Sequence, residues 1–255
     1  MAIKGPWVGS SAKAETGESW MRAAATAVRI GGGGFMMSSL IGKSKAIQVY
    51  INSSDHNYNV DKLLNAVRAV MPQNQWGSVE LQLYVGSGVQ LVSSTTGAPC
   101  LDFGYLSSFI KITLENNGTI LGRGGNGGGK DRTKEGYPGG TAIRRNATLY
   151  INNRGVIGGG GGGGGIRGND GAGGGCPFGS GGGGSKVMGN QGSDGQNASF
   201  SGAGAGGGNA GAGGWYGQRG VTAYDPFPGG AAGAAVDGGG TFGWINRGTV
   251  YGSAP

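Results

Sequence analysis

The sequence contains little of what metal sites, disulfides and nucleophilic active sites are made of. It has two cysteines and one histidine in 255 residues. Cys100 and Cys176 are far apart and have no metal-ligand spacing around them, which predicts two free thiols. The single histidine, His56, has no cysteine, glutamate or second histidine at ligand spacing, and we expect it in a turn, paired with Asp55. These absences predict no metal, no cofactor and no catalytic centre.

Long apolar runs and concentrated charge are also missing. No run of about 18 apolar residues occurs, so no membrane-spanning helix is expected. The first residues, 1–7, lack the apolar core of a secretory signal, so we expect synthesis in the cytoplasm without a signal peptide. The net charge is +7, but the basic residues are scattered, and Arg144-Arg145 is the only adjacent basic pair. Nucleic-acid binders gather positive charge into a patch or stripe, so no nucleic-acid partner is expected.

What the sequence has in abundance is glycine, unevenly distributed. Of its 64 glycines, 13 lie in residues 1–117 and 51 in residues 118–255. This shift predicts two domains, 1–117 with ordinary globular composition and 118–255 with very little regular helix or strand.

The first domain has the pattern of a small α+β unit. Thr16 is a candidate N-cap for a helix that runs to about Ile30, with Trp20 in its apolar stripe. Asn59 is a candidate N-cap for a second helix that ends before Pro72. Alternating apolar residues predict strands over 46–51, 79–85, 89–93 and 109–114.

Three segments share one pattern: an apolar residue, an asparagine, a short turn with glycine, then a β-branched pair. They are residues 113–122, 149–158 and 243–252. Asparagine and glycine tolerate positive φ, so the shared Asn-x-Gly predicts a tight corner between two short extended segments. This resembles one coil of a β-solenoid, with long insertions between unevenly spaced coils.

The insertions consist largely of glycine runs, of which 158–165 is uninterrupted. Serine, the usual partner of glycine in flexible linkers, is scarce in them. A glycine segment can form the extended three-fold polyproline-II-type helix, whose backbone groups all point outward. The runs therefore predict a stack of polyglycine-II helices joined by loops, in which lateral hydrogen bonds replace an apolar core.

The segments between the runs hold most aromatic residues of this half of the chain. We expect these side chains to contact a partner rather than fill a core, because tyrosine and tryptophan among glycine, serine and asparagine are typical of binding loops. The segments are 130–141, 166–170, 176–178, 185–201 and 215–228. The predicted receptor-binding residues are Tyr137, Phe178, Phe200, Trp215, Tyr216, Tyr224 and Phe227.

Enzyme motifs are not supported. The stretch 124–130 approaches a phosphate-binding loop, but Asp131 stands where serine or threonine must bind Mg²⁺, and no helix-forming stretch follows. No nucleophile, base and orienting acid can be assembled, because the single histidine lies in the other predicted domain. The sequence therefore predicts a binding protein and not an enzyme.

The whole pattern resembles one known family, the receptor-recognition adhesins of T-even-type bacteriophages. The segments that carry the resemblance are Gly5–Ser11, Glu15–Met21, Asp55–Asn57, Gly122–Gly127 and Ile151–Asn153 running into the glycine run. The resemblance implies a virion protein, one copy at the distal tip of the long tail fibre. Its first domain would attach to the trimeric fibre protein, with Trp7 and Trp20 in the attachment part. Its loops would bind an outer-membrane protein, or lipopolysaccharide, of the host.

Three other functions remain open at this point. A fibre-assembly chaperone would be absent from the mature virion. A glycan hydrolase at the fibre tip would need paired carboxylates in a groove, and an ice-binding protein would need a flat and regular face.

Overall fold

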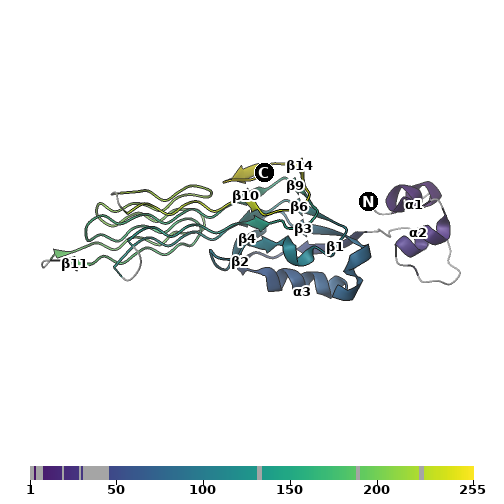
Figure 1. The fold of residues 1–255 in the computed structure, drawn as a ribbon, viewed down its shortest axis with the longest axis horizontal. Helices are drawn as coiled ribbons and strands as arrows, with labels where there is room; N and C mark the ends of the chain where they lie inside the picture. The colour runs from purple at the N-terminus through teal and green to yellow at the C-terminus, as the bar shows by residue number, and fades with distance from the viewer. Residues whose placement is uncertain are drawn as a thin grey trace.

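In the computed structural model the protein is elongated, with three parts in a row (Figure 1). A pair of short helices lies at one end, a strand-rich body in the middle and extended glycine segments at the other end. The residues described are 3, 8–18, 20–28, 30, 46–130, 134–187, 190–223 and 227–255. No helix among them is long and apolar enough to cross a membrane.

The body consists of three parallel sheets. Each pass of the chain through the body adds one strand to the first sheet and then one to the second. The first contains β1 (Ala46–Ile51), β3 (Glu80–Val85), β6 (Lys111–Asn116), β9 (Leu149–Asn153) and β14 (Phe242–Asn246). The second contains β2 (Asp55–Tyr58), β4 (Gln90–Ser93), β7 (Thr119–Leu121), β10 (Val156–Gly158) and β15 (Thr249–Tyr251). The third contains β5 (Leu101–Asp102), β8 (Ile143–Arg144) and β13 (Val236–Asp237). Successive coils stack in register, as in a β-solenoid.

The three Asn-Gly repeats occupy the corner between the first and second sheets. In each repeat the asparagine side chain accepts a hydrogen bond from the backbone N–H two residues further on, as in an Asx-turn. The acceptor and donor pairs are Asn116 with Gly118, Asn153 with Gly155 and Asn246 with Gly248.

Asn153 also joins neighbouring coils. It is fully buried, donates to the carbonyls of Arg247 and Thr249 at 2.7 and 3.1 Å, and accepts from Asn116 at 2.8 Å. The asparagines therefore fix both the local turn and the stacking of one coil on the next.

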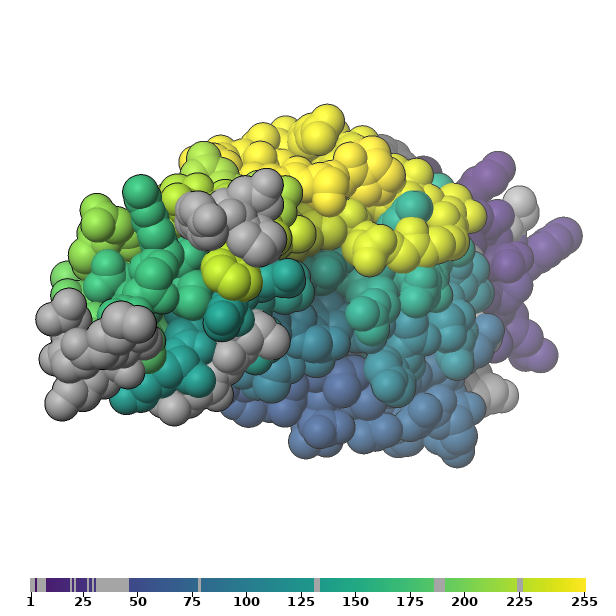
Figure 2. Space-filling model, turned by 60° about the vertical axis from the view of Figure 1, so that its left-hand side comes forward, coloured from purple at the N-terminus to yellow at the C-terminus, as the bar shows by residue number. Residues whose placement is uncertain are grey.

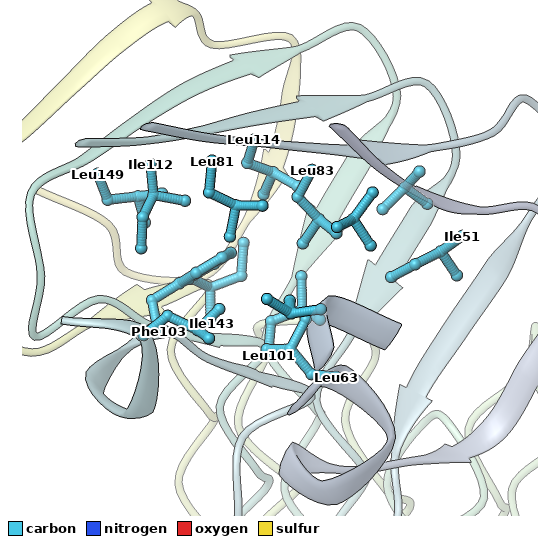
Figure 3. Close-up of a cluster of buried hydrophobic side chains, with 14 of the residues drawn as sticks. Ile51, Leu63, Leu81, Leu83, Leu101, Phe103, Ile112, Leu114, Ile143 and Leu149 are labelled. Carbon is cyan, nitrogen blue, oxygen red and sulfur yellow. The ribbon is translucent and has the colours of Figure 1, made fainter. Parts of the chain in front are cut away.

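An apolar core fills the space between the sheets and helix α3 (Val60–Val70). The side chain of Asn59 caps α3 as predicted, accepting from the Lys62 N–H at 3.0 Å. Two 3₁₀ helices, η2 (Gln73–Ser78) and η3 (Phe103–Leu106), complete the enclosure, and the Trp76 ring stacks on Phe109 at 5.0 Å. Figure 3 shows side chains from the sheets and from α3 meeting in this space. The predicted boundary at residue 117 falls between β6 and β7, so strands on both sides of it share one core.

The helix predicted from Thr16 to about Ile30 is present as α2 (Met21–Ala27), which begins later than predicted, and the sequence did not predict the helix before it, α1 (Val8–Thr16). Thr16 ends α1 instead of starting a helix, because Gly17 follows in the left-handed region with φ +76°. α1 and α2 share a small core of their own, formed by Ile3, Val8, Ala12, Ala24, Ala25 and Val28.

Both glycine insertions leave the body at the same corner. One leaves after β7 and returns at β8, and the other leaves after β10 and returns at β13. Because β7 pairs with β10 and β8 pairs with β13, the insertions start and end side by side. Their extended segments run together away from the body (Figure 1). At the far end, β11 (Lys186–Val187) and β12 (Asn190–Gln191) form a short antiparallel hairpin.

The uninterrupted run 158–165 is bonded on every side. Its amides donate in a repeating order of three: Gly160 to Gly140, Gly161 to Cys176 and Gly162 to Gln218, then Gly163 to Tyr137, Gly164 to Gly173 and Gly165 to Val221. Its carbonyls accept from three further segments, through the amides of Gly125, Gly214 and Gly230 among others. The run is therefore the centre of the lattice.

The close packing explains why this run contains no other residue type. A Cβ atom on Gly162 would lie 1.8 Å from the carbonyl oxygen of Gly230, and one on Gly163 would lie 1.9 Å from that of Asn126. Real Cβ atoms do not approach backbone this closely, so any larger side chain would push neighbouring segments apart.

We expect Gly162→Ala to destabilise the protein by roughly 1–3 kcal/mol, because the added methyl group overpacks the lattice centre. The matched control is Gly97→Ala in the body, where a Cβ atom meets nothing within 4 Å. Urea unfolding followed by circular dichroism measures both. Equal stability of the two variants would contradict the packed lattice, as would random-coil amide exchange of the glycines at 158–165 in the unaltered protein.

Candidate functional site

The connections between glycine segments alternate between the two ends of the lattice. Three of them lie at the end next to the body, around 176–178, 199–202 and 215–218. The others lie at the far end. We call them the distal turns, and their described residues are Lys130 and Lys134, 166–170, 185–187 with 190–192, 207–210, and 222–223 with Phe227. Figure 2 turns this end forward and shows segments from distant parts of the chain on one face.

Four of the seven predicted contact residues lie next to the body. Phe178, Phe200, Trp215 and Tyr216 gather there with Cys176 against Val92 and Leu121 of the body strands. Tyr216 is only 8% exposed, and its hydroxyl donates to the carbonyl of Phe200. The thiol of Cys176 donates to the same carbonyl at 3.1 Å. We call these five residues the aromatic junction, and their position favours a packing role over the predicted contact role.

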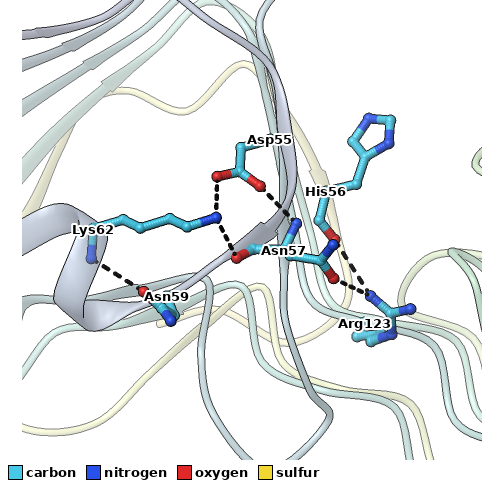
Figure 4. Close-up of polar contacts among 6 residues, drawn as sticks. All are labelled: Asp55, His56, Asn57, Asn59, Lys62 and Arg123. Carbon is cyan, nitrogen blue, oxygen red and sulfur yellow. Dashed lines mark hydrogen bonds and ion pairs between the residues drawn. The ribbon is translucent and has the colours of Figure 1, made fainter.

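His56 joins the aromatic junction from the body side. It lies in β2 and not in a turn. Its ring stacks on Phe200 with the centroids 5.3 Å apart, and it lies tilted by 40° to the ring of Phe178 with the centroids 5.0 Å apart. Its Nε2 lies 3.2 Å from Gln90 Oε1. The predicted pairing with Asp55 was wrong, because Asp55 forms an ion pair with Lys62 (Figure 4).

Arg123, at the root of the first glycine segment, ties the lattice to the body. Its guanidinium donates to the His56 carbonyl and the Asn57 side chain at 3.3 and 3.4 Å (Figure 4), and lies 5.7 Å from the centre of the Phe178 ring. Its backbone N–H donates to Ser93 Oγ at 2.7 Å. The junction is therefore held by polar contacts as well as by aromatic packing.

The distal turns are tied together by one carboxylate. Asp170 accepts from the backbone N–H groups of Ser193 and Asn209, each at 3.0 Å, and these two hydrogen bonds lower the pKa of its carboxyl group. A Cβ atom on Gly208 would lie 2.2 Å from this carboxylate, and Gly208 has φ +48°. The turn at 207–210 lies inside a stretch that the sequence predicted as one glycine run. The structure shows the turn by the hydrogen bond from the Ala210 N–H to the Gly207 carbonyl at 2.8 Å.

Of the remaining predicted contact residues, Tyr137 is 37% exposed midway along the returning segment, where its N–H donates to the Asn126 carbonyl. The Lys134 ammonium lies 5.0 Å above the ring of Phe227 at the distal end. Tyr224 lies outside the described residues. A pocket of about 300 Å³ opens beside Lys134, lined by Gly129, Lys130, Lys134, Ile166, Gly168, Asn169, Asp170, Gly183 and Ser185. Sequence reasoning did not single out this pocket.

At the opposite end of the molecule, Trp20 stands out from the helix pair. Its residue surface is 80% exposed, so it lies outside the small core that α1 and α2 share. The other predicted attachment residue, Trp7, lies outside the described residues.

Catalytic and metal chemistry find no support in the residues described. Within these residues no group of three or more histidine, cysteine, aspartate or glutamate side chains is placed to hold a metal ion. The amides of 124–128, which resembled a phosphate-binding loop, are bonded to neighbouring carbonyls such as those of Pro177 and Gly161. Burial raises the pKa of the Cys176 thiol to about 11, which keeps it protonated and unreactive at neutral pH.

Fold and site together define an elongated scaffold that presents turns at one end and an exposed tryptophan at the other. The model of the family "Phage tail fibre adhesin Gp38" matches residues 46–255, and that of the "Phage tail fibre adhesin Gp38 N-terminal domain" matches residues 1–41. The chain belongs to the phage tail fibre adhesin Gp38 family.

One curated relative and one solved structure extend over nearly the whole chain. The receptor-recognizing protein gp38 of Salmonella phage S16 is 39% identical over an alignment 263 residues long, which covers 99% of this chain and 99% of the relative. The crystal structure of the gp37–gp38 adhesin tip complex of the bacteriophage S16 long tail fiber is similar with a TM-score of 0.67 and 38% identity, again over 99% of both chains. The relative is named for receptor recognition and not for catalysis.

We expect Tyr216→Phe to destabilise the protein by about 1–2 kcal/mol, because it removes a buried hydrogen-bond donor to the Phe200 carbonyl. Urea unfolding followed by circular dichroism measures the stability of the variant. Tyr137→Phe is the matched control and should change stability by less than about 0.5 kcal/mol. A Tyr216 variant as stable as the control would show that the hydroxyl does not hold the junction.

Proposed function

We propose that this protein is the adhesin at the distal tip of a phage long tail fibre, and that it binds a host outer-membrane receptor without catalysing a reaction. The observation that carries the proposal is the gathering of the distal turns on one face of a bonded lattice. This face lies at the opposite end of the molecule from α1 and α2. Full-length similarity to a protein named for receptor recognition supports the same reading.

Receptor contact then falls to the distal turns and not to the aromatic junction. Among the predicted contact residues we assign it to Tyr137 and Phe227, together with Tyr224, whose placement is outside the described residues. Phe178, Phe200, Trp215 and Tyr216 instead lock the lattice to the body. Lys130, Lys134 and Arg167 give the distal end positive charge, which favours approach to the anionic surface of a Gram-negative host.

Exchange of the distal turns tests this assignment. Replacing 186–191 and 222–227 with the corresponding turns of the Salmonella phage S16 relative should reduce binding of the purified protein to its own host cells by at least about tenfold, since contact residues at the centre of an interface dominate affinity. The matched control exchanges the body-end turns 176–178 and 199–202 and should leave host binding intact. Unchanged binding after the distal exchange would refute the assignment.

We infer that the helix pair attaches the protein to the trimeric fibre protein. An exposed tryptophan is a common anchor of interfaces, because its ring removes much apolar area from water. The separate family model for residues 1–41 and the similarity to a gp37–gp38 complex support this division of roles. Trp7 belongs to the same proposed surface.

We expect Trp20→Ala to weaken binding to the fibre tip by at least about thirtyfold, the usual loss at an interface hot spot. Its thermal unfolding midpoint should stay unchanged, because the side chain is exposed. Tyr105→Ala removes another exposed ring, this one from the body, and serves as the control in the same pull-down titration. Retained fibre binding by the Trp20 variant would place the attachment surface elsewhere.

The glycine segments are proposed to be polyglycine-II helices. The support is that every third amide in 160–165 donates to the same neighbouring segment. A helix with three residues per turn produces this pattern, because residues three apart face the same side. Three-bond couplings of the glycine amides should report φ near roughly −75° for this form. Couplings typical of a flat strand, near roughly −140°, would overturn it.

A further inference from the structure

The pocket among the distal turns has walls fixed by backbone bonds. Lys130 N–H donates to the Gly183 carbonyl at 3.0 Å, Ile166 N–H to the Lys134 carbonyl at 3.1 Å, and Ser185 N–H to the Asn169 carbonyl at 2.8 Å. These three bonds join the ends of separate glycine segments around one space of about 300 Å³. A volume of this size is at the small end of the range for ligand sites, so a single compact group would fill it.

The charge of the pocket is positive. Lys130 and Lys134 line it, and within the described part of the chain neither ammonium group takes part in an ion pair. Among the described residues of the lining, Asp170 is the acidic one, and its oxygens accept from the N–H groups of Ser193 and Asn209. The described part of the lining therefore carries two positive charges against one negative charge that is already hydrogen-bonded.

The other lining groups suit a hydroxylated ring. Asn169 and Ser185 supply an amide and a hydroxyl, and the buried Ile166 supplies an apolar surface. An extended peptide would need free backbone groups to pair with as an added strand. The amides of Lys130, Ile166 and Ser185 are already bonded across the pocket walls, so recognition has to come from side chains.

We propose that this pocket binds one acidic saccharide unit, a sugar ring bearing a phosphate or a carboxylate. Lys130 and Lys134 would hold the acidic group, and Asn169 and Ser185 the ring hydroxyls. The proposal rests on the proposed function, because it names the chemical class that the distal end recognises on a cell surface.

The test uses the full chain and glucose 1-phosphate as the phosphate probe, with galacturonate as the carboxylate probe. Titration followed by amide chemical shifts should show saturable changes at 128–130, 168–170 and 183–185. Glucose and inorganic phosphate should each bind at least about tenfold more weakly, because each lacks half of the contacts, and charge-assisted hydrogen bonds are the stronger part. Saturable binding of either acidic sugar supports the proposal. Binding of inorganic phosphate as tight as that of both sugars, or no saturable change, overturns it.

Matched variants separate a built site from diffuse charge. Lys130→Gln and Lys134→Gln should each weaken sugar binding by about tenfold, whereas Arg154→Gln, which removes the same charge from an exposed turn of the body, should change it by less than about twofold. Equal losses in all three variants would refute the pocket.

The distal-turn exchange keeps the two proposals distinguishable. If that exchange abolishes host binding while the unaltered protein ignores both acidic sugars, only the saccharide proposal fails. If the sugars bind at the pocket while the exchange leaves host binding intact, the proposed function fails.

Discussion

The central constraint on this protein is that the run 158–165 must satisfy every backbone group through its neighbours. Residues 160–165 of this run donate to three surrounding segments and accept from three others. A backbone so enclosed leaves no room for a Cβ atom, so glycine is the only residue that fits. Each hydrogen bond contributes only about 0.5–1.5 kcal/mol net, and the lattice replaces an apolar core with many of them. The glycine segments are thus hydrogen-bonded structural elements and not flexible linkers.

The solenoid body fixes the register in which the glycine segments begin, which the glycine segments cannot set by themselves. Its paired strands place the beginnings and ends of both insertions side by side. The buried asparagines hold the coils in step, and Arg123 and the aromatic junction fix the lattice to the body. The lattice is held by backbone hydrogen bonds, whereas its attachment to the body is mostly apolar. The aromatic side chains of the junction supply the apolar surface for this attachment.

The alternation of turns gives the insertions two kinds of turn. Turns at the body end pack their rings, fully or partly buried, against the body strands. Most distal turns are longer and more polar, and they include lysine and aspartate. The distal turns are also tied to one another, since the Asp170 carboxylate accepts from the N–H groups of Ser193 and Asn209.

Much of this protein follows from its sequence alone. The Asn-Gly repeats predicted the solenoid corners, Asn59 predicted the start of α3, and the glycine runs predicted extended bonded segments, because each of these is a local backbone preference. The sequence could not place the turns. Gly208 reverses the chain inside a stretch of glycines and alanines in which Asn209 is the one residue that favours a turn, and this signal was too weak to separate a turn from a continuous run. Tyr216 and Phe178 were predicted as contact residues, and the sequence does not show that they lie beside the body. Only the tertiary structure decides at which end of the lattice each turn lies, because this depends on where every earlier segment ended.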